Sequence, residues 1–314
     1  MMKRLLMRRL LLSVPLLFVV SVVVFVLQSL IPGDAASQLA GLQATQEDVL
    51  RLRRQLDLDE PIWAQYWHWL DGVFHGSLGT SLTNKEPVTT ALGTRLPVTL
   101  SLVLGATVLA TVLGVVLGVA SSRAGSLAGR AVDLLSVGGL AVPSFWLGLL
   151  LISLLSVRLG LLPATGYVRF ADSPDGWARS LLLPVGALAL GGVTAVAKQT
   201  REAMLDVLGR PHIDNLRANG VPERRVVFKH ALRGAAIPIC TMSSILLVGA
   251  LGGSVVIEQV FGLPGLGGLA VSATGSKDIP VIQGVAVYFT LLVVAANLLT
   301  DIAYALIDPR VRAS

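Results

Sequence analysis

Long apolar runs alternate with polar segments along the whole chain. Each run is close to the roughly 20 residues that a membrane-spanning helix needs. The six runs are Leu10–Ile31, Val98–Ala120, Ala131–Val157, Leu181–Ala197, Ile237–Val256 and Val281–Ile307. Runs of this length predict helices, because within lipid a helix satisfies every backbone polar group inside its own segment. The pattern therefore predicts an all-α, polytopic membrane protein with six transmembrane helices.

The first long polar section runs from Pro32 to about Pro97. It contains an amphipathic stretch, Thr45–Leu56, and a cluster of aromatic side chains: Trp63, Tyr66, Trp67 and Trp69. Trp and Tyr favour the membrane interface, because one end of the side chain is apolar and the other polar. Two interpretations remain, an interfacial belt and a surface for an extracytoplasmic partner. We expect residues 1–97 to form an N-terminal part and residues 98–314 a five-span core.

The second polar section, Gln199–Pro238, is longer than a simple link between two spans requires. Pro211 and Gly220 divide it into three short helix-like pieces, since Pro starts a new helix and Gly ends one. Pro222 is predicted at the first position of the third piece, where the adjacent Glu223 suits the positive end of the helix dipole. The section is interpreted either as a docking element or as a solvated basic loop that only fixes topology.

Composition excludes a water-soluble globule. Of the 314 residues 54% are hydrophobic and 14% charged, whereas soluble domains carry roughly 25% charged residues. The formal charge of +6 comes mainly from basic residues beside the apolar runs, which indicates membrane orientation rather than nucleic-acid binding. The single Cys240 excludes an intrachain disulfide and a cysteine-based metal site.

The distribution of charge predicts which segments face the cytoplasm. The segment before the first run has four basic residues and no acidic one, and residues 198–236 have eight basic residues against four acidic ones. The segments Arg158–Ser180 and Glu258–Pro280 are close to balanced. The positive-inside rule then places both termini in the cytoplasm and Pro32–Pro97 outside. The first run is longer than the core of a signal peptide, so we expect a retained span.

Glycine spacing predicts how the spans pack. Gly114 and Gly118 in the second run, and Gly249 and Gly253 in the fifth, each form a small-xxx-small pair. Such pairs let two helices approach closely. Pro143 is expected inside the third run, where neighbouring helices would cover the freed backbone groups. The pattern indicates a packed bundle of helices.

Motifs for catalysis are missing from the sequence. There is no phosphate-binding loop, and the Gly-rich stretch Gly262–Gly268 follows no strand of a βαβ unit, which argues against a dinucleotide site. Asp301 is the main ionisable residue within the runs, whereas proton-coupled carriers place several such groups in their spans. A pore that moves a solute without such ionisable groups needs energy from another protein. Gln199–Pro238 is the only large cytoplasmic segment predicted here that could receive it.

Short motifs occur along almost the whole chain. Each motif is short, but their order and spacing together are highly specific. They are Pro32–Asp34, Leu58–Pro61, Gly76–Ser81, Pro143–Gly148, Arg201–Leu208, His230–Arg233, Glu258–Gly267, Asn297–Asp301 and Asp308–Arg312. With these motifs the chain resembles a permease subunit of an ABC importer in the dipeptide, oligopeptide and nickel branch. The resemblance implies a type I importer fold and an inner-membrane location in a bacterium.

The resemblance also implies a site. In such permeases a coupling helix docks in a groove of the ATPase subunit, with the pattern Glu-Ala-Ala, three residues, then Gly. Asp214-Asn215-Leu216 precedes Gly220 at that spacing, although Leu216 and Asn219 depart from the Ala and Lys usual in this branch. The implied ATPase-coupling residues are Asp214, Asn215, Leu216, Arg217, Gly220, Glu223, His230 and Arg233.

The resulting hypothesis is a permease subunit that forms half of a translocation pathway for short peptides or related solutes. The implied partners are a second, related permease, two cytoplasmic ATPases and an extracytoplasmic binding protein. ATP and magnesium would be bound by the ATPases, so no cofactor and no enzyme activity are expected in this chain. The alternatives are a stand-alone carrier or channel and a structural scaffold. No residue selects among peptides, nickel chelates and other solutes.

Overall fold

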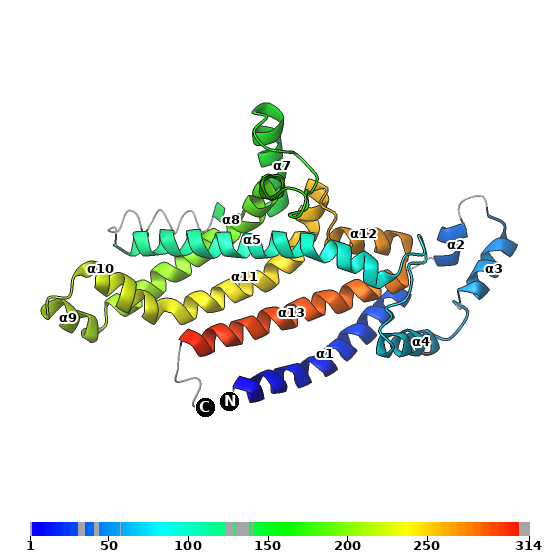
Figure 1. Ribbon diagram of the computed structural model, residues 1–314, viewed down its shortest axis with the longest axis horizontal. Helices are drawn as coiled ribbons and strands as arrows, with labels where there is room; N and C mark the ends of the chain where they lie inside the picture. The colour runs from blue at the N-terminus through cyan, green and yellow to red at the C-terminus, as the bar shows by residue number, and fades with distance from the viewer. Residues whose placement is uncertain are drawn as a thin grey trace. The chain divides into compact units, whose positions relative to one another are not determined.

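The computed structural model describes residues 2–30, 35–40, 44–56, 58–123, 129, 138–139 and 141–307. In these residues the regular elements are helices (Figure 1). They are α1 (Met2–Leu30), α2 (Ala35–Ala40), α3 (Gln46–Gln55), α4 (Ile62–Phe74), α5 (Val88–Arg123), α7 (Ser144–Leu151), the π-helix η1 (Ile152–Arg158), α8 (Pro174–Leu208), α9 (Pro211–Ala218), α10 (Glu223–Arg225), the π-helix η2 (Val226–Ala231), α11 (Leu232–Phe261), α12 (Leu266–Ser276) and α13 (Ile279–Ile307). The all-α fold class is confirmed.

Five of the six predicted spans coincide with helices long and apolar enough to cross a membrane. They lie in α1, α5, α8, the continuous helical stretch Glu223–Phe261, and α13. Of the third predicted span, residues 131–137 and 140 lie outside the described residues, and its C-terminal part is the shorter apolar helix Ser144–Arg158. Pro143 is the N-cap of α7 and does not lie inside a helix. Proline disfavours the helical conformation of the residue before it, although Pro184 and Pro238 are accommodated inside α8 and α11. The motifs Pro32–Asp34 and Asp308–Arg312 also lie outside the described residues.

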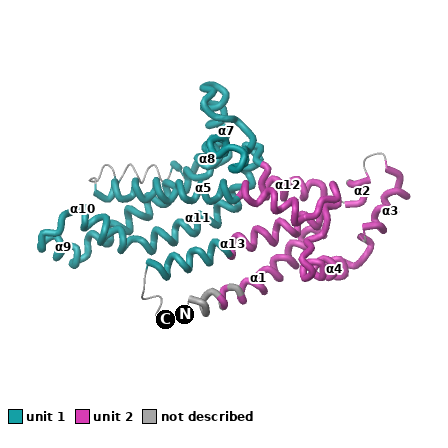
Figure 2. Tube along the Cα trace, viewed as in Figure 1, with its two compact units in different colours: residues 1–2, 100–263, 295–314 teal, residues 3–99, 264–294 magenta. Residues whose placement is uncertain are grey.

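The chain forms two compact units, coloured separately in Figure 2. Unit 1 contains the first two residues with Leu100–Leu263 and Ala295–Ser314, and unit 2 contains Lys3–Thr99 with Pro264–Val294. Two of the boundaries fall within the long helices α5 and α13, and another falls between Leu263 and Pro264, in the turn between α11 and α12. The division at residue 97 expected from the sequence stays a prediction.

In unit 1, α5 lies against α8 at the predicted glycine pair. A Cβ atom added at Gly114 would lie 2.5 Å from Val196 Cβ, and one added at Gly118 would lie 2.5 Å from Thr200 Cβ. These separations leave no room for a side chain, so the close approach predicted for Gly114 and Gly118 is confirmed. For the second pair, a Cβ added at Gly253 would lie 3.1 Å from Leu188 Cδ1, whereas among the described residues nothing lies within 4 Å of one added at Gly249, which lines a cavity of about 320 Å³. The close contact predicted for this pair is therefore found at Gly253 and not at Gly249.

Hydroxyl groups link α11 to its neighbours in unit 1. Thr111 of α5 donates to Ser243 at 3.0 Å, and Thr300 of α13 donates to Ser244 at 2.7 Å. Tyr304 of α13 donates to Thr241 at 2.7 Å. Interhelical hydrogen bonds of this kind contribute about 0.6 kcal/mol each on average within membranes. They hold one turn of α11 against two other helices.

In unit 2, the buried carboxylate of Asp278 holds the Gly76–Ser81 motif and the residues after it. Asp278 is 3% exposed and accepts hydrogen bonds from Ser81 Oγ at 2.5 Å, from Thr83 Oγ1 at 3.1 Å and from the backbone N–H of Leu82 at 3.1 Å. A buried carboxylate needs hydrogen-bond donors to replace the water that it has lost, and the loop supplies them. The loop between α4 and α5 is therefore fixed to the turn between α12 and α13.

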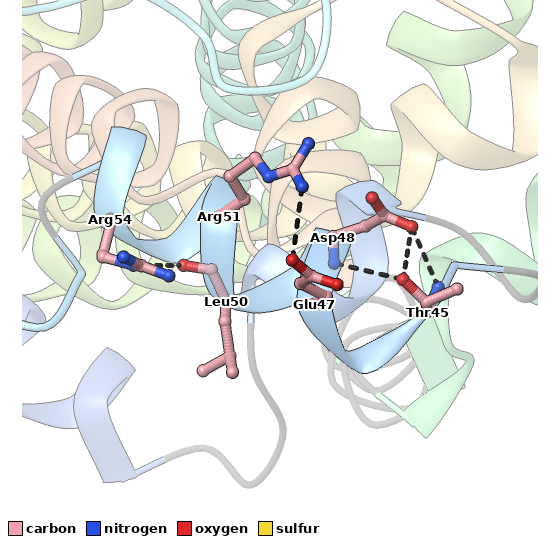
Figure 3. A network of polar contacts seen from close by, with 6 residues as sticks. All are labelled: Thr45, Glu47, Asp48, Leu50, Arg51 and Arg54. Carbon is pink, nitrogen blue, oxygen red and sulfur yellow. Dashed lines mark hydrogen bonds and ion pairs between the residues drawn. The ribbon is translucent and has the colours of Figure 1, made fainter.

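Helix α3 begins at a capping box (Figure 3). Asp48 N–H donates to Thr45 Oγ1, while Thr45 Oγ1 and N–H donate to the Asp48 carboxylate at 2.6 and 3.2 Å. The bond from the Thr45 hydroxyl lowers the pKa of Asp48 below its ordinary value. A lowered folded-state pKa means that this stabilisation is present at neutral pH and is lost as the pH falls through that value. The amphipathic helix predicted over Thr45–Leu56 is confirmed.

Candidate functional site: the α9–α10 segment

The α9–α10 segment, residues 211–225, lies between the long helices α8 and α11. Helix α8 ends at Leu208 with Gly209 as its C-cap, and Arg210 takes an extended conformation before Pro211 opens α9. Pro is favoured at this first helical position, because its missing N–H would have no partner inside the helix. The break predicted at Pro211 is confirmed. Arg210 pairs with Asp206 of the preceding helix at 2.5 Å.

Ile213 fixes α9 to the rest of unit 1. Its side chain is fully buried and packs in a cluster with residues of α8, η2 and α11. The buried members of this cluster are Val119, Ala203, Met204, Val207, Ile213, Val226, Val227, Ala231, Ala235 and Ile239. Burying an aliphatic side chain contributes roughly 1.5–3 kcal/mol. Ile213 is not among the site residues predicted from the sequence, although a lone large aliphatic residue between His212 and Asp214 is a signal for an inward-facing position.

Gly220 ends α9 in the left-handed conformation, with φ of +76°. Its N–H donates to the carbonyl of Arg217 at 2.9 Å, and the N–H of Val221 donates to the carbonyl of Leu216 at 3.1 Å. These two bonds define a Schellman motif, in which the left-handed residue is usually Gly. The apolar side chains of Leu216 and Val221 both pack against the cluster around Ile213. The helix end predicted at Gly220 is confirmed.

Arg217 joins α9 to α10 across this turn. Its guanidinium donates two hydrogen bonds to the Glu223 carboxylate, at 3.0 and 3.2 Å, and a third to Asp214 at 3.3 Å. The hydrogen bond with Glu223 raises the pKa of Arg217 above its ordinary value. A two-pronged pair of this kind fixes the relative orientation of both side chains. The arginine therefore restrains the angle at which α10 leaves the turn.

The other predicted site residues lie on three different elements. Asn215 is exposed on α9, where its carbonyl accepts a hydrogen bond from Asn219 Nδ2 at 2.8 Å. His230 is half-buried in η2 and Arg233 is exposed at the start of α11. Among the described residues, neither of these two belongs to the Asp214–Arg217–Glu223 cluster. Pro222 is the N-cap of α10 and Glu223 its first residue, so the predicted helix start was one residue early.

Several helices long and apolar enough to span a membrane, with a short charged helix pair between α8 and α11, define an integral membrane protein. The chain belongs to the family of binding-protein-dependent transport system inner membrane components, whose model matches residues 110–313, and it is a permease subunit of an ABC importer. A second model, describing the N-terminal part of these membrane components, matches residues 2–103. This family is a transport permease component, not an enzyme. The chain is thus a multi-pass protein of the inner membrane.

Relatives of similar length support this assignment. The chain is 43% identical over 313 residues to a Brucella melitensis protein whose name describes a permease of a peptide transport system, covering 99% of each. It is 37% identical over 306 residues to the glutathione transport system permease protein GsiC of Salmonella choleraesuis, covering 97% of each. The methionine ABC transporter MetNI in an inward-facing conformation is similar in fold, with a TM-score of 0.57 and 20% identity. That match covers 70% of this chain and 97% of the other.

Proposed function

We propose that the α9–α10 segment is the coupling element through which an ATPase subunit drives this permease. The observation that carries the proposal is the closed turn at Gly220, locked by the Schellman bonds and by Arg217. A docking element must keep its shape when the ATPase subunit moves it. A flexible element would deform instead of passing that movement to the membrane helices. The buried Ile213 connects this turn to α8 and α11, so a displacement of α9 would move both long helices.

The surface offered to the ATPase is the polar side of this turn. The exposed side chains are those of Asp214, Asn215 and Arg217, with Glu223 beyond Gly220. Both signs of charge lie close together, which favours a partner with a complementary pattern rather than a surface of uniform charge. We place His230 and Arg233 at the margin of the contact, since they follow in η2 and α11.

The complete assembly is proposed to contain this chain with a second, related permease, two ATPases and an extracytoplasmic binding protein. Short peptides, including glutathione-like ones, are the proposed solutes, because the relatives are named for peptide and glutathione transport. ATP and magnesium are proposed to bind the ATPases only. In this arrangement the chain contributes half of the solute pathway, and its helices change position when the ATPases close.

Replacing Arg217 by lysine tests the role of the locked turn. Lysine keeps the charge but cannot form the two-pronged pair with Glu223. Exposed ion pairs contribute less than about 1 kcal/mol, so we expect substrate-stimulated ATP hydrolysis to fall by less than about tenfold in the reconstituted importer. Asp214→Ala should have a smaller effect that weakens further with added salt.

The matched control for this test is Arg210→Lys. That change weakens the exposed Arg210–Asp206 pair, which lies before the α9–α10 segment. We expect it to leave coupling unchanged. Equal losses in Arg217→Lys and Arg210→Lys would show that the turn has no special part in coupling.

The proposed topology places both termini and the α9–α10 segment in the cytoplasm. In a Cys240→Ser background, a cysteine at Gln46, on the exposed side of α3, should react with an impermeant thiol reagent added to intact spheroplasts. A cysteine at the exposed His212 should react only in inside-out vesicles. If His212 reacts in spheroplasts and Gln46 reacts only in inside-out vesicles, the proposed topology is wrong and the α9–α10 segment lies outside.

A further inference from the structure

Helix α4 presents three chemically different faces around its axis. At about 100° per residue, its side chains fall into three groups, each within roughly 60° of arc. One face carries Trp63, Trp67 and Phe74, a second carries His68, Asp71 and His75, and a third carries Tyr66, Trp69 and Val73. A helix that simply lies on a protein surface needs only two faces, one buried and one polar.

The third face packs α4 against the other helices of unit 2. Tyr66 is 8% exposed, its hydroxyl lies 2.8 Å from Ser21 Oγ of α1, and its ring makes edge contacts with Phe18 and Phe25 at centroid distances of 6.3 and 5.5 Å. Trp69 and Val73 pack against the apolar cluster that contains Leu92 and Val285. These contacts fix the rotation of α4 about its axis, so the directions of the other two faces are determined.

The aromatic face is exposed. Trp63, Trp67 and Phe74 are 70%, 58% and 81% exposed respectively. Leaving three large apolar rings on one side of a fixed helix in water is unfavourable, at roughly 25 cal/mol per Å². The neighbouring polar face has partners of its own, with His68 Nδ1 3.1 Å from Glu60 and His75 Nδ1 3.7 Å from Asp71. The aromatic face therefore needs an apolar or interfacial environment, and the polar face needs water.

We propose that Trp63, Trp67 and Phe74 lie in the lipid headgroup region of the leaflet that contains the C-terminal end of α1. The spanning helix α1, against which α4 packs, exposes Leu16, Val19 and Val23 among other apolar side chains. Exposed apolar side chains on a helix of spanning length suit contact with lipid, and α4 is attached to that same helix through Tyr66. Trp is enriched at this depth of the bilayer, and a helix lying in the interface has its polar side towards water. This inference concerns anchoring of unit 2 and does not rest on the proposed coupling function.

Paired spin labels test the inference on the assembled importer. The labels are placed in a Cys240→Ser background at Trp67 or His68, and at Phe74 or His75, in nanodiscs of phosphatidylethanolamine and phosphatidylglycerol. Within each pair the residues are adjacent and exposed, so they differ in direction and not in position along the helix. We expect the ratio of oxygen to nickel-chelate collision rates to be several-fold higher at Trp67 and Phe74 than at their partners.

Two results would overturn the inference. Similar ratios within each pair would mean that α4 stands in water, and low collision rates with both reagents at Trp67 and Phe74 would mean that protein covers the face. A second measurement uses the fluorescence of the native Trp67 itself, obtained as the difference between the unchanged protein and Trp67→Phe. The fluorescence lost in Trp67→Phe should be the part that is quenched by lipids brominated near the headgroup, and quenching by aqueous iodide or by deep bromines alone would contradict the proposed depth.

Discussion

Replacing Gly220 by valine is expected to uncouple ATP hydrolysis from transport while the protein still inserts in the membrane. Gly220 has a φ of +76°, a region that costs L-residues roughly 1–2 kcal/mol, and β-branched residues are genuine outliers there. Within the part of the chain that the structure describes, nothing lies within 4 Å of a Cβ added at this position, so the effect comes from the backbone and not from a clash. The turn would relax, α10 would leave at another angle, and the docking surface would lose its shape. Because a factor of ten corresponds to 1.36 kcal/mol, we expect at least about a tenfold loss of coupled uptake.

The measurement is substrate-stimulated ATP hydrolysis alongside uptake in the reconstituted complex. Gly220→Asn is the matched control, because asparagine tolerates the left-handed conformation and the open space accommodates either side chain. We expect Gly220→Asn to keep most of the coupling. If correctly assembled Gly220→Val keeps both rates, the α9–α10 segment only fixes topology and the proposed coupling role is wrong.

Replacing Gly118 by alanine is expected to destabilise unit 1. The added Cβ would lie 2.5 Å from Thr200 Cβ and 2.7 Å from the carbonyl oxygen of Ala197, and a backbone oxygen on a helix cannot move alone. Overpacking of this kind costs typically 1–3 kcal/mol, against a gain of roughly 0.5–1 kcal/mol from removing a glycine from a helix. We expect a net loss of stability, a larger one for Gly118→Val, and earlier unfolding in a detergent or thermal titration.

Gly93→Ala separates packing from helix propensity. Gly93 lies in the same helix, α5, and no atom of the described residues lies within 4 Å of its added Cβ. Only the propensity term then operates, so this variant should be neutral or slightly more stable. A Gly118→Ala variant as stable as Gly93→Ala would show that α5 and α8 can separate without cost.

The two glycines are constrained for different reasons. Gly220 is required by its own backbone conformation, whereas Gly118 is required by the surface of another helix. We therefore expect Gly220→Val to reduce transport at temperatures where the protein is still folded, and Gly118→Ala to change unfolding first. Measuring both properties in both variants distinguishes a damaged turn from a loosened bundle.

Features governed by local physical chemistry could be predicted from the sequence. The long apolar helices follow from the length of the apolar runs, since a bilayer leaves no other way to satisfy the backbone. The break at Pro211 and the helix end at Gly220 follow from φ restrictions of single residues. The α3 helix with its Thr45 cap follows from a short-range pattern of the same kind. The coupling role of the implied site residues remains a proposal, because no contact within this chain tests it.

Features that depend on contacts between distant residues were decided only by the tertiary structure. The burial of Ile213, the docking of Asp278 on Ser81 and the open space at Gly249 all depend on which helix lies opposite. Gly249 and Gly114 share one spacing in the sequence, yet only Gly114 faces a neighbouring helix at close range. The directions of the aromatic side chains were likewise decided by packing, because Tyr66 contacts α1 while Trp63 and Trp67 stay exposed; both interpretations of the cluster remain predictions. Sequence spacing fixes which side chains share a face, but the packing of the helices determines what that face meets.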